Sequence, residues 1–121
     1  MKYLLLIYDR EQDWQNMSEA DQGAIYAEYM KFSQDIKDSG NYLNGAQLHP
    51  VDSATSVRVR DGEQLVTDGP FAETHEQLGG FYLIEAKDLD EATALAARIP
   101  SARFGTVEVR PLVERTATAN A

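Results

Sequence analysis

The stretch Lys2-Tyr-Leu-Leu-Leu-Ile-Tyr8 is, after its first residue, an unbroken apolar run with the length of a β-strand. A second run of the same kind, Phe81-Tyr-Leu-Ile84, lies in the C-terminal half of the chain. A strand with one face in water alternates apolar and polar residues, so runs without alternation predict strands that are covered on both faces. We therefore expect these segments to be the central strands of one sheet.

Each apolar run is followed by a pattern that predicts a helix. Ser18 with Asp21 has the character of a helix N-terminus, and this helix should end near Gly40. Asp88 with Glu91 caps a second helix in the same way, and Pro100 stops it. Apolar residues recur at helical spacing in both segments, at Ile25, Tyr29, Phe32 and Ile36 and at Ala92, Leu95, Ala96 and Ile99.

Further strands are expected beside these elements, at residues 42–48, 54–60, 64–67 and 106–110. The second of these alternates and is rich in β-branched residues, which predicts a half-buried strand. Asp61-Gly62 predicts the tight turn of a hairpin. Thr74 and Gln77 have capping-box spacing, which predicts a short helical turn before the second apolar run.

This order of elements predicts an α+β fold, a ferredoxin-like βαββαβ sandwich with an extra hairpin before the third main strand. Two helices cover only one sheet face, so the outward side chains of the central strands need another cover. We expect a homodimer, sheet against sheet, that encloses a dimeric α+β barrel. The alternative is a monomer in which residues 9–16 and 41–53 fold over that face. Residues 1–113 form the single domain, and 114–121 are expected to be a frayed tail.

The composition excludes several classes of partner and chemistry. Among 121 residues, 11 Lys and Arg stand against 20 Asp and Glu, a net charge of −9, which disfavours nucleic acid and anionic membranes as partners. The absence of Cys excludes disulfides, thiolate nucleophiles and Cys-ligated metals. The N-terminal apolar run is too short for a signal peptide or a membrane span, so we expect a cytoplasmic protein.

No cofactor is predicted, because the chain has no Gly-rich phosphate loop, no nucleophile elbow and no zinc pattern. A Mg²⁺ or Ca²⁺ site built from carboxylates alone remains open, although no ligand spacing supports one.

A long block, Val66-Thr-Asp-Gly-Pro-Phe-Ala-Glu-Thr-His-Glu-Gln-Leu-Gly-Gly-Phe-Tyr-Leu-Ile84, resembles the signature of the YCII-related family, in its DGPF-domain branch. Residues 1–8, 54–58 and 89–92 also resemble members of that family. The resemblance implies a ferredoxin-like dimeric α+β barrel, similar in shape to muconolactone isomerase, in bacterial proteins often encoded beside extracytoplasmic-function sigma factors. The branch usually has Lys where this chain has His75, so a role that needs a permanent cation there is not expected.

Asp68 is the principal candidate for catalysis, because Gly69-Pro70 would hold its carboxyl in one direction. If it projects into the barrel beneath Phe71, it would exchange protons with a bound substrate. In the alternative interpretation, Asp68 bonds the amides of its own turn. His49, in extended chain before Pro50, is the better placed of the two histidines to meet it.

Four other side chains are candidates for substrate binding: Phe71, Glu73, His75 and Tyr82. Glu73 would form a carboxylate pair with Asp68, His75 would titrate near neutrality, and Tyr82 would offer a phenol. The structural alternatives are a solvated surface acid for Glu73, an exposed ion-pair partner for His75 and a core aromatic with a satisfied hydroxyl for Tyr82.

Two functions follow from these residues. In the first, the protein binds a small molecule and is a cofactor-free acid–base enzyme, isomerase-like or lyase-like. In the second, it is a non-enzymatic ligand-binding or regulatory module, in which the barrel holds a ligand or the acidic surface engages a protein such as a sigma factor.

Overall fold

The computed structural model describes residues 1–115 of the chain. Its strands are β1 (Lys2–Asp9), β2 (Tyr42–Gln47), β3 (Thr55–Arg60), β4 (Glu63–Asp68), β5 (Gln77–Glu85) and β6 (Thr106–Pro111). Its helices are α1 (Glu11–Gln15), α2 (Glu19–Asp38) and α3 (Leu89–Ala97), with 3₁₀ turns η1 (Val51–Ser53) and η2 (Pro100–Arg103). Most of the expected tail, residues 116–121, lies outside the described residues.

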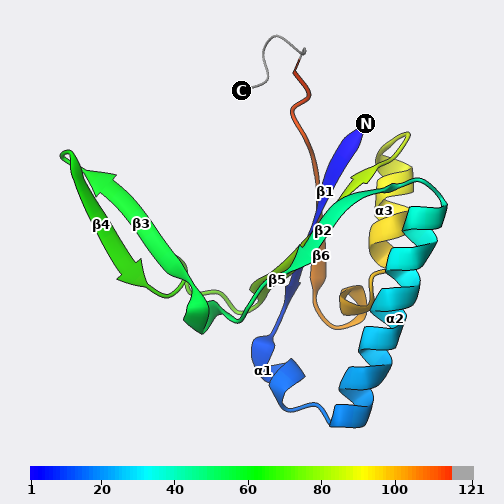
Figure 1. Ribbon diagram of the computed structural model, residues 1–121, viewed down its shortest axis with the longest axis horizontal. Coiled ribbons are helices and arrows are strands. Elements are labelled where there is room, and N and C mark those ends of the chain that lie inside the picture. Colours follow the sequence, from blue (N-terminus) through cyan, green and yellow to red (C-terminus); the bar gives the residue numbers. More distant parts are fainter. Residues whose placement is uncertain (116–121) are drawn as a thin grey trace.

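The main sheet has four strands in the order β2-β5-β1-β6, and every neighbouring pair is antiparallel. Helices α2 and α3 lie on the same side of this sheet (Figure 1). Both predicted central strands, β1 and β5, occupy the middle of the sheet. The ferredoxin-like α+β fold that the two apolar runs predicted is therefore confirmed.

The core fills the space between the sheet and the helices. Leu5, Ile36, Ile84 and Ile99 are fully buried in it, and each stabilises the fold by about 2 kcal/mol relative to an exposed position. The N-termini of α2 and α3 are capped as predicted. The Ser18 side chain accepts from the Asp21 amide, and the Asp88 side chain accepts from the Glu91 amide. The remaining core side chains are Tyr3, Ile7, Phe32, Tyr82, Ala86, Ala92, Leu95 and Ala96.

The opposite face of the sheet is apolar along its middle. Leu4 pairs with Leu83 and Leu6 with Phe81 in the β1–β5 register, and all four are partly exposed. Residues 42–47 form the edge strand β2, and α1 packs on the helix side of the molecule through a Trp14–Tyr26 contact. Neither α1 nor β2 therefore covers the outer face, and the choice between a monomer and a dimer stays a prediction.

The β3–β4 hairpin forms its own two-stranded sheet and projects away from the main sheet on the side opposite the helices (Figure 1). Asp61 (φ 51°) and Gly62 (φ 76°) form the predicted tight turn. The expectation of a half-buried strand is wrong, since Val57 and Val59 are 56% and 60% exposed. Within residues 1–115, the hairpin packs extensively against no other helix or strand.

The helical turn expected at Thr74 and Gln77 is also wrong, because the chain there is irregular and then enters β5 at Gln77. In a capping box the threonine oxygen accepts from a backbone amide. Here the Thr74 hydroxyl donates to the carbonyl of Glu76, and the Gln77 side-chain amide donates to the carbonyl of Thr74. These local bonds stabilise a bend, because side chains occupy the backbone carbonyls of Thr74 and Glu76.

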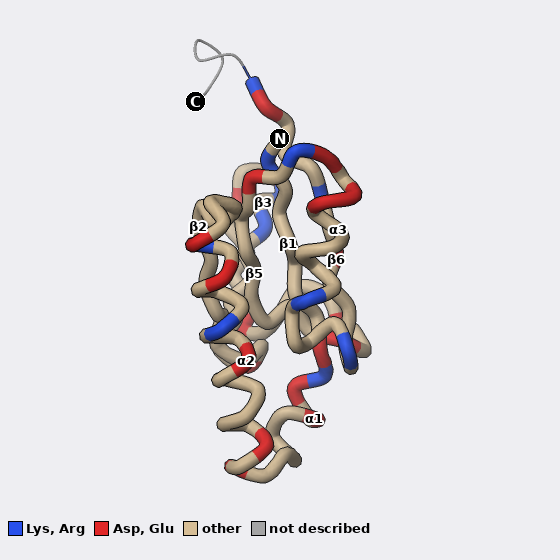
Figure 2. The backbone as a smooth tube through the Cα atoms, turned by 90° about the vertical axis from the view of Figure 1, so that its right-hand side faces the viewer, with Lys and Arg blue, Asp and Glu red and all other residues tan. Residues whose placement is uncertain are grey.

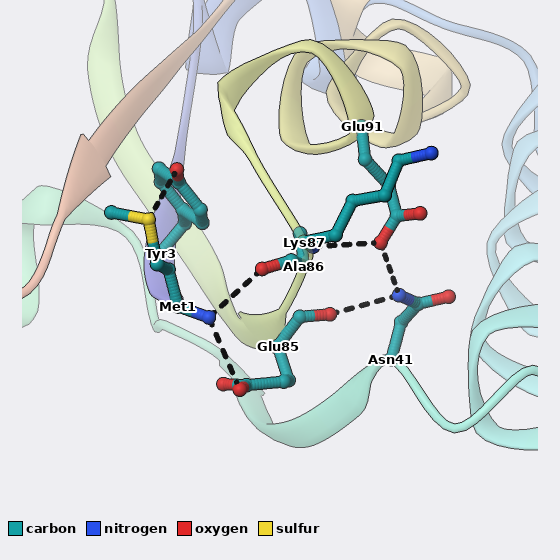
Figure 3. Close-up of polar contacts among 7 residues, drawn as sticks. All are labelled: Met1, Tyr3, Asn41, Glu85, Ala86, Lys87 and Glu91. Carbon is teal, nitrogen blue, oxygen red and sulfur yellow. Dashed lines mark hydrogen bonds and ion pairs between the residues drawn. The ribbon is translucent and has the colours of Figure 1, made fainter.

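A polar network ties the N-terminal end of β1 to its neighbours (Figure 3). The amino group of Met1 donates to the Ala86 carbonyl at 2.9 Å and pairs with the Glu85 carboxylate at 3.2 Å. Asn41, which precedes β2, donates to the Glu85 carbonyl at 2.8 Å and to the Glu91 carboxylate of α3 at 3.2 Å. Asp9 lies at the opposite end of β1 from this network.

Candidate functional site

A cavity of about 400 Å³ lies between the helices and the sheet at the C-terminal end of β1. This volume falls within the range of about 300–1,000 Å³ that is usual for small-molecule sites. Its wall is rich in aromatic residues and comes from α1, α2, β1, β2, β5 and the segment at η2. Six aromatic residues that line it are Trp14, Tyr26, Tyr29, Tyr42, Tyr82 and Phe104.

Helical spacing on α2 and glycines in the strands together make this space. Tyr26, Tyr29 and Ser33 recur three and four positions apart, so one face of α2 turns toward the cavity. On the sheet side, Gly45 and Gly80 line the cavity with bare backbone. A Cβ atom at Gly45 would lie 3.0 Å from the Tyr82 ring, and one at Gly80 would lie 2.9 Å from the Ala46 carbonyl oxygen. Larger residues at these positions would displace their neighbours.

Asp9, Ser101 and Tyr29 form a hydrogen-bonded chain at the cavity wall. The Ser101 side chain is buried, and its hydroxyl donates to Asp9 Oδ2 at 3.0 Å. The Tyr29 hydroxyl lies 2.6 Å from Ser101 Oγ. Since the single Ser101 proton is directed to Asp9, the Tyr29 hydroxyl is the donor to Ser101. The chain thus links a carboxylate on β1 to a phenol on α2 through a buried serine.

Burial raises the pKa of the Asp9 carboxyl above its ordinary value of 3.8. The hydrogen bond from Ser101 lowers this pKa, whereas the negative charges of Glu76 and Asp13 raise it further. Within residues 1–115, none of the ion pairs involves Asp9. Asp9 is therefore a carboxyl at a cavity wall whose pKa lies above its ordinary value, a shift in the direction that favours proton exchange with a ligand.

The phenols of Tyr29 and Tyr82 stay protonated at neutral pH. Burial raises the pKa of Tyr29 and that of Tyr82, each opposed by a serine hydrogen bond. The Tyr82 hydroxyl lies 2.7 Å from Ser33 Oγ. Both phenols can donate hydrogen bonds but cannot supply a negative charge.

Two hydrogen bonds of Glu11 hold the start of α1 against the neighbouring chain. Glu11 accepts from the Val51 amide through Oε2 at 3.0 Å, and its own amide donates to the Gln77 side chain at 3.1 Å. Lys37, farther along α2, places its ammonium 5.0 Å from the centroid of the Tyr42 ring. The carboxylates and the ammonium that line the cavity thus belong to different ends of it.

Of the side chains predicted from the sequence, Tyr82 lines this cavity. Leu48 and Pro50 also line it, but His49 between them is exposed and does not. His75 lies beside a separate depression of about 390 Å³ that Arg10, Thr74 and Gln77 also line. Neither histidine therefore lines the cavity that holds the Asp9 chain.

Asp68 lies at the end of β4, opposite Thr55 in the exposed hairpin. The Gly69 amide donates to the Ala54 carbonyl at 2.7 Å, and the Ser56 hydroxyl donates to the Gly69 carbonyl at 2.8 Å. One backbone bond and one serine hydroxyl therefore hold this turn. Phe71 is 79% exposed, and Glu73 is exposed as well. None of Asp68, Phe71 and Glu73 lines the cavity.

Sequence reasoning missed Asp9, Ser101 and Tyr29 as site residues. One signal for Asp9 was present, because strand alternation places it on the same face as Tyr3, Leu5 and Ile7. The helical spacing of Tyr29 with Ile25 and Phe32 predicts only a core residue. No sequence pattern singles out Ser101, whose role depends on where η2 meets the end of β1.

Residues 1–115 contain no group of three or more His, Asp or Glu side chains placed to hold a metal ion. In the same residues, no helix is both long enough and apolar enough to cross a membrane. Figure 2 shows the Lys and Arg positions dispersed among acidic ones along the chain.

Comparison with known proteins gives a consistent assignment. The family model of the YCII-related domain matches residues 1–116. An uncharacterised protein of Rhizobium meliloti (strain 1021) is 37% identical over 114 residues, which cover 93% of this chain and 92% of that protein. Membership in the DGPF branch stays a prediction. The chain belongs to the YCII-related family.

Proposed function

We propose that this protein binds a small molecule in the cavity beside Asp9 and moves a proton to and from it without a cofactor. The observation that carries the proposal is the Asp9 carboxyl itself, which lines a 400 Å³ cavity and accepts a hydrogen bond from the buried Ser101. Acid–base sites frequently contain a carboxyl group whose pKa is raised and which lies in a cavity lined by aromatic residues.

The proposed chemistry is an isomerase-like or lyase-like proton transfer. As a carboxylate, Asp9 would take a proton from an acidic carbon of the ligand. As the acid, it would return that proton either to another ligand atom, which completes an isomerisation, or to a leaving group, which completes an elimination. Ser101 would stabilise the carboxylate by its hydrogen bond, and Tyr29 would hold the Ser101 hydroxyl in the required orientation.

The proposal gives Asp9 the role that the sequence predicted for Asp68. It is supported by position, because Asp68 lies on the exposed hairpin and Asp9 lies at the cavity wall. Tyr82, already expected to bind substrate, keeps that role as a phenol at the cavity wall held by Ser33.

Hydrogen–deuterium exchange tests the catalytic step before a substrate is known. A panel of small ketones, oxo acids and lactones is incubated with the protein in ²H₂O, and loss of C–H signals is followed by NMR. We expect Asp9→Asn to slow the exchange of an accepted compound by about 100-fold or more. Asp61→Asn, which removes the same charge at the exposed hairpin turn, should leave the rate unchanged. An Asp9→Asn variant that exchanges as fast as the wild type would contradict the proposal.

The non-enzymatic alternative predicts a different result in the same samples. A ligand that shifts the amide signals of Gly79 and Gly80, which line the cavity, but exchanges no hydrogen would favour a binding module. The expected association with a sigma factor stays a prediction, which co-purification of such a factor would test.

We also propose that a second copy of the chain covers the outer face of the sheet. Support comes from the four partly exposed apolar residues on the central strands, Leu4, Leu6, Phe81 and Leu83. Glu108 and Arg110, which pair with each other, flank this strip on β6. An apolar centre with a charged rim is the usual composition of a dimer interface.

A further inference from the structure

The end of the cavity nearest α1 combines aromatic rings with carboxylates. Trp14 and Tyr26 both line it and meet edge to face, with ring centroids 5.2 Å apart. Asp9 and Glu11 line the same cavity. The faces of such rings attract cations because their π electrons carry partial negative charge.

The electrostatic environment of this end is negative. Glu76 and Asp13 lie close enough to Asp9 to raise the pKa of its carboxyl, in addition to the effect of burial. Within residues 1–115, the ion pairs involve neither Asp9 nor Glu11. No cationic side chain of this part of the protein therefore neutralises the two lining carboxylates by direct contact.

The basic residue of the lining, Lys37, lies at the other end. It is eight positions beyond Tyr29 on α2, a rise of about 12 Å along the helix axis. Its ammonium already lies over the Tyr42 ring. An anionic ligand group placed at Asp9 would be repelled there without compensation from Lys37.

We propose that the aromatic and acidic end of the cavity binds the ammonium group of a small organic cation. The ammonium lies against the carboxylates of Asp9 and Glu11 and the rings of Trp14 and Tyr26. The apolar body of the ligand extends over the bare backbone of Gly80 toward Tyr82. This inference rests on the proposed small-molecule function of the cavity and names the class of ligand.

An organic cation fits this end better than a metal ion does. The described residues do not bring three carboxylate or imidazole groups together as metal ligands. The site instead offers aromatic surface around a pair of carboxylates, which matches a charged head group on an apolar body. The bond to each carboxylate would be charge-assisted, so charge should contribute more to affinity than shape alone.

Trp14 provides the readout, because it is the one tryptophan of the chain and lines the cavity. The protein is titrated at neutral pH with three probes of similar shape: 2-phenylethylammonium, neutral 2-phenylethanol and anionic 3-phenylpropanoate. Amide shifts of Gly79 and Gly80 provide a second signal. We expect the cation to bind about tenfold more tightly than the alcohol, as a charge-assisted contact implies, and the carboxylate to bind most weakly.

Substitutions test whether the carboxylates of Asp9 and Glu11 cause the preference for the cation over the alcohol. Asp9→Asn and Glu11→Gln should each reduce the preference for the cation while binding of the alcohol persists. Glu11→Gln keeps an oxygen that can accept from the Val51 amide. It therefore still tests the role of charge if Asp9→Asn folds poorly. Asp61→Asn, with the same loss of charge at the distant hairpin turn, should leave the preference unchanged.

The outcomes separate this inference from the function on which it rests. If the alcohol or the carboxylate binds as tightly as the cation, the cation assignment is overturned and the cavity remains a small-molecule site. If none of the three probes changes either signal, both the assignment and the small-molecule function of this cavity are contradicted.

Discussion

The Ser101 hydroxyl lies 3.0 Å from the Asp9 carboxylate although 92 positions separate the two residues in the chain. Asp9 ends the first strand, and Ser101 lies in the turn that follows the last helix. Their contact therefore forms only when α3 and η2 have packed against the sheet. The proposed acid is thus positioned by the completed tertiary fold rather than by its local sequence.

Replacing Ser101 by Ala removes the donor to Asp9 and the acceptor of Tyr29 in one step. We expect the free energy of unfolding to fall by about 1–3 kcal/mol, because partly buried polar groups lose their partners. The pKa of Asp9 should rise further, since the Ser101 hydrogen bond lowers it. Urea denaturation and NMR titration measure the two effects. Ser53→Ala, at an exposed position, is the control, and equal stability of the two variants would contradict the network.

The raised pKa of Asp9 gives the protein a stability term that depends on pH. Between the ordinary value of 3.8 and the raised folded-state value, the folded state binds more protons than the unfolded state. The contribution of Asp9 to stability is therefore complete below this window and is lost as pH rises through it. The stability of the wild type relative to Asp9→Asn should fall as pH rises, which urea denaturation at several pH values would show. A relative stability that grows with pH would contradict the burial of Asp9.

Gly105 allows β6 to approach the end of β1 closely. A Cβ atom there would overlap the Tyr8 carbonyl oxygen and lie 3.0 Å from the Asp9 Cβ. Gly105→Ala should lower the free energy of unfolding by about 1–3 kcal/mol, as overpacking does, and should weaken ligand binding by moving Asp9. Gly23→Ala is the matched control on α2, where nothing lies within 4 Å, and it should stabilise the helix by about 1 kcal/mol. Thermal denaturation of both variants distinguishes them, and a stable Gly105→Ala protein would refute the close approach.

A charge on the outer face of the sheet should separate the proposed dimer. Leu6→Arg and Phe81→Arg place a cation in the apolar strip of β1 and β5, whereas Met30→Arg alters a side chain on α2 that is 74% exposed. Analytical ultracentrifugation should show a dimer for the wild type and Met30→Arg, and a monomer for the two sheet variants. A monomeric wild type at the same concentration would count against a second copy on this face.

The central architecture could be predicted because local patterns determine it. The two apolar runs placed β1 and β5 in the middle of the sheet, and Ser18 and Asp88 marked the helix starts. Alternation in the segment 54–60 correctly predicted a strand, but alternation alone does not show what packs on that strand. The hairpin therefore proved exposed on both faces.

The site was harder to predict because its parts meet only in three dimensions. The rigid Gly69-Pro70 turn drew attention to Asp68, yet that turn belongs to a ribbon that leaves the body of the protein. Asp9 could have been placed on the inner face by its alternation with Leu5 and Ile7. No sequence pattern could have placed Ser101 beside it.

The most direct test of the account is an NMR titration of the Asp9 side-chain carboxyl carbon in the intact protein. The account predicts a midpoint above the ordinary value of 3.8, as expected for a partly buried acid that lines a cavity. A midpoint at or below that value would show that Asp9 is a solvated carboxylate and would remove the basis for its proposed role in proton transfer.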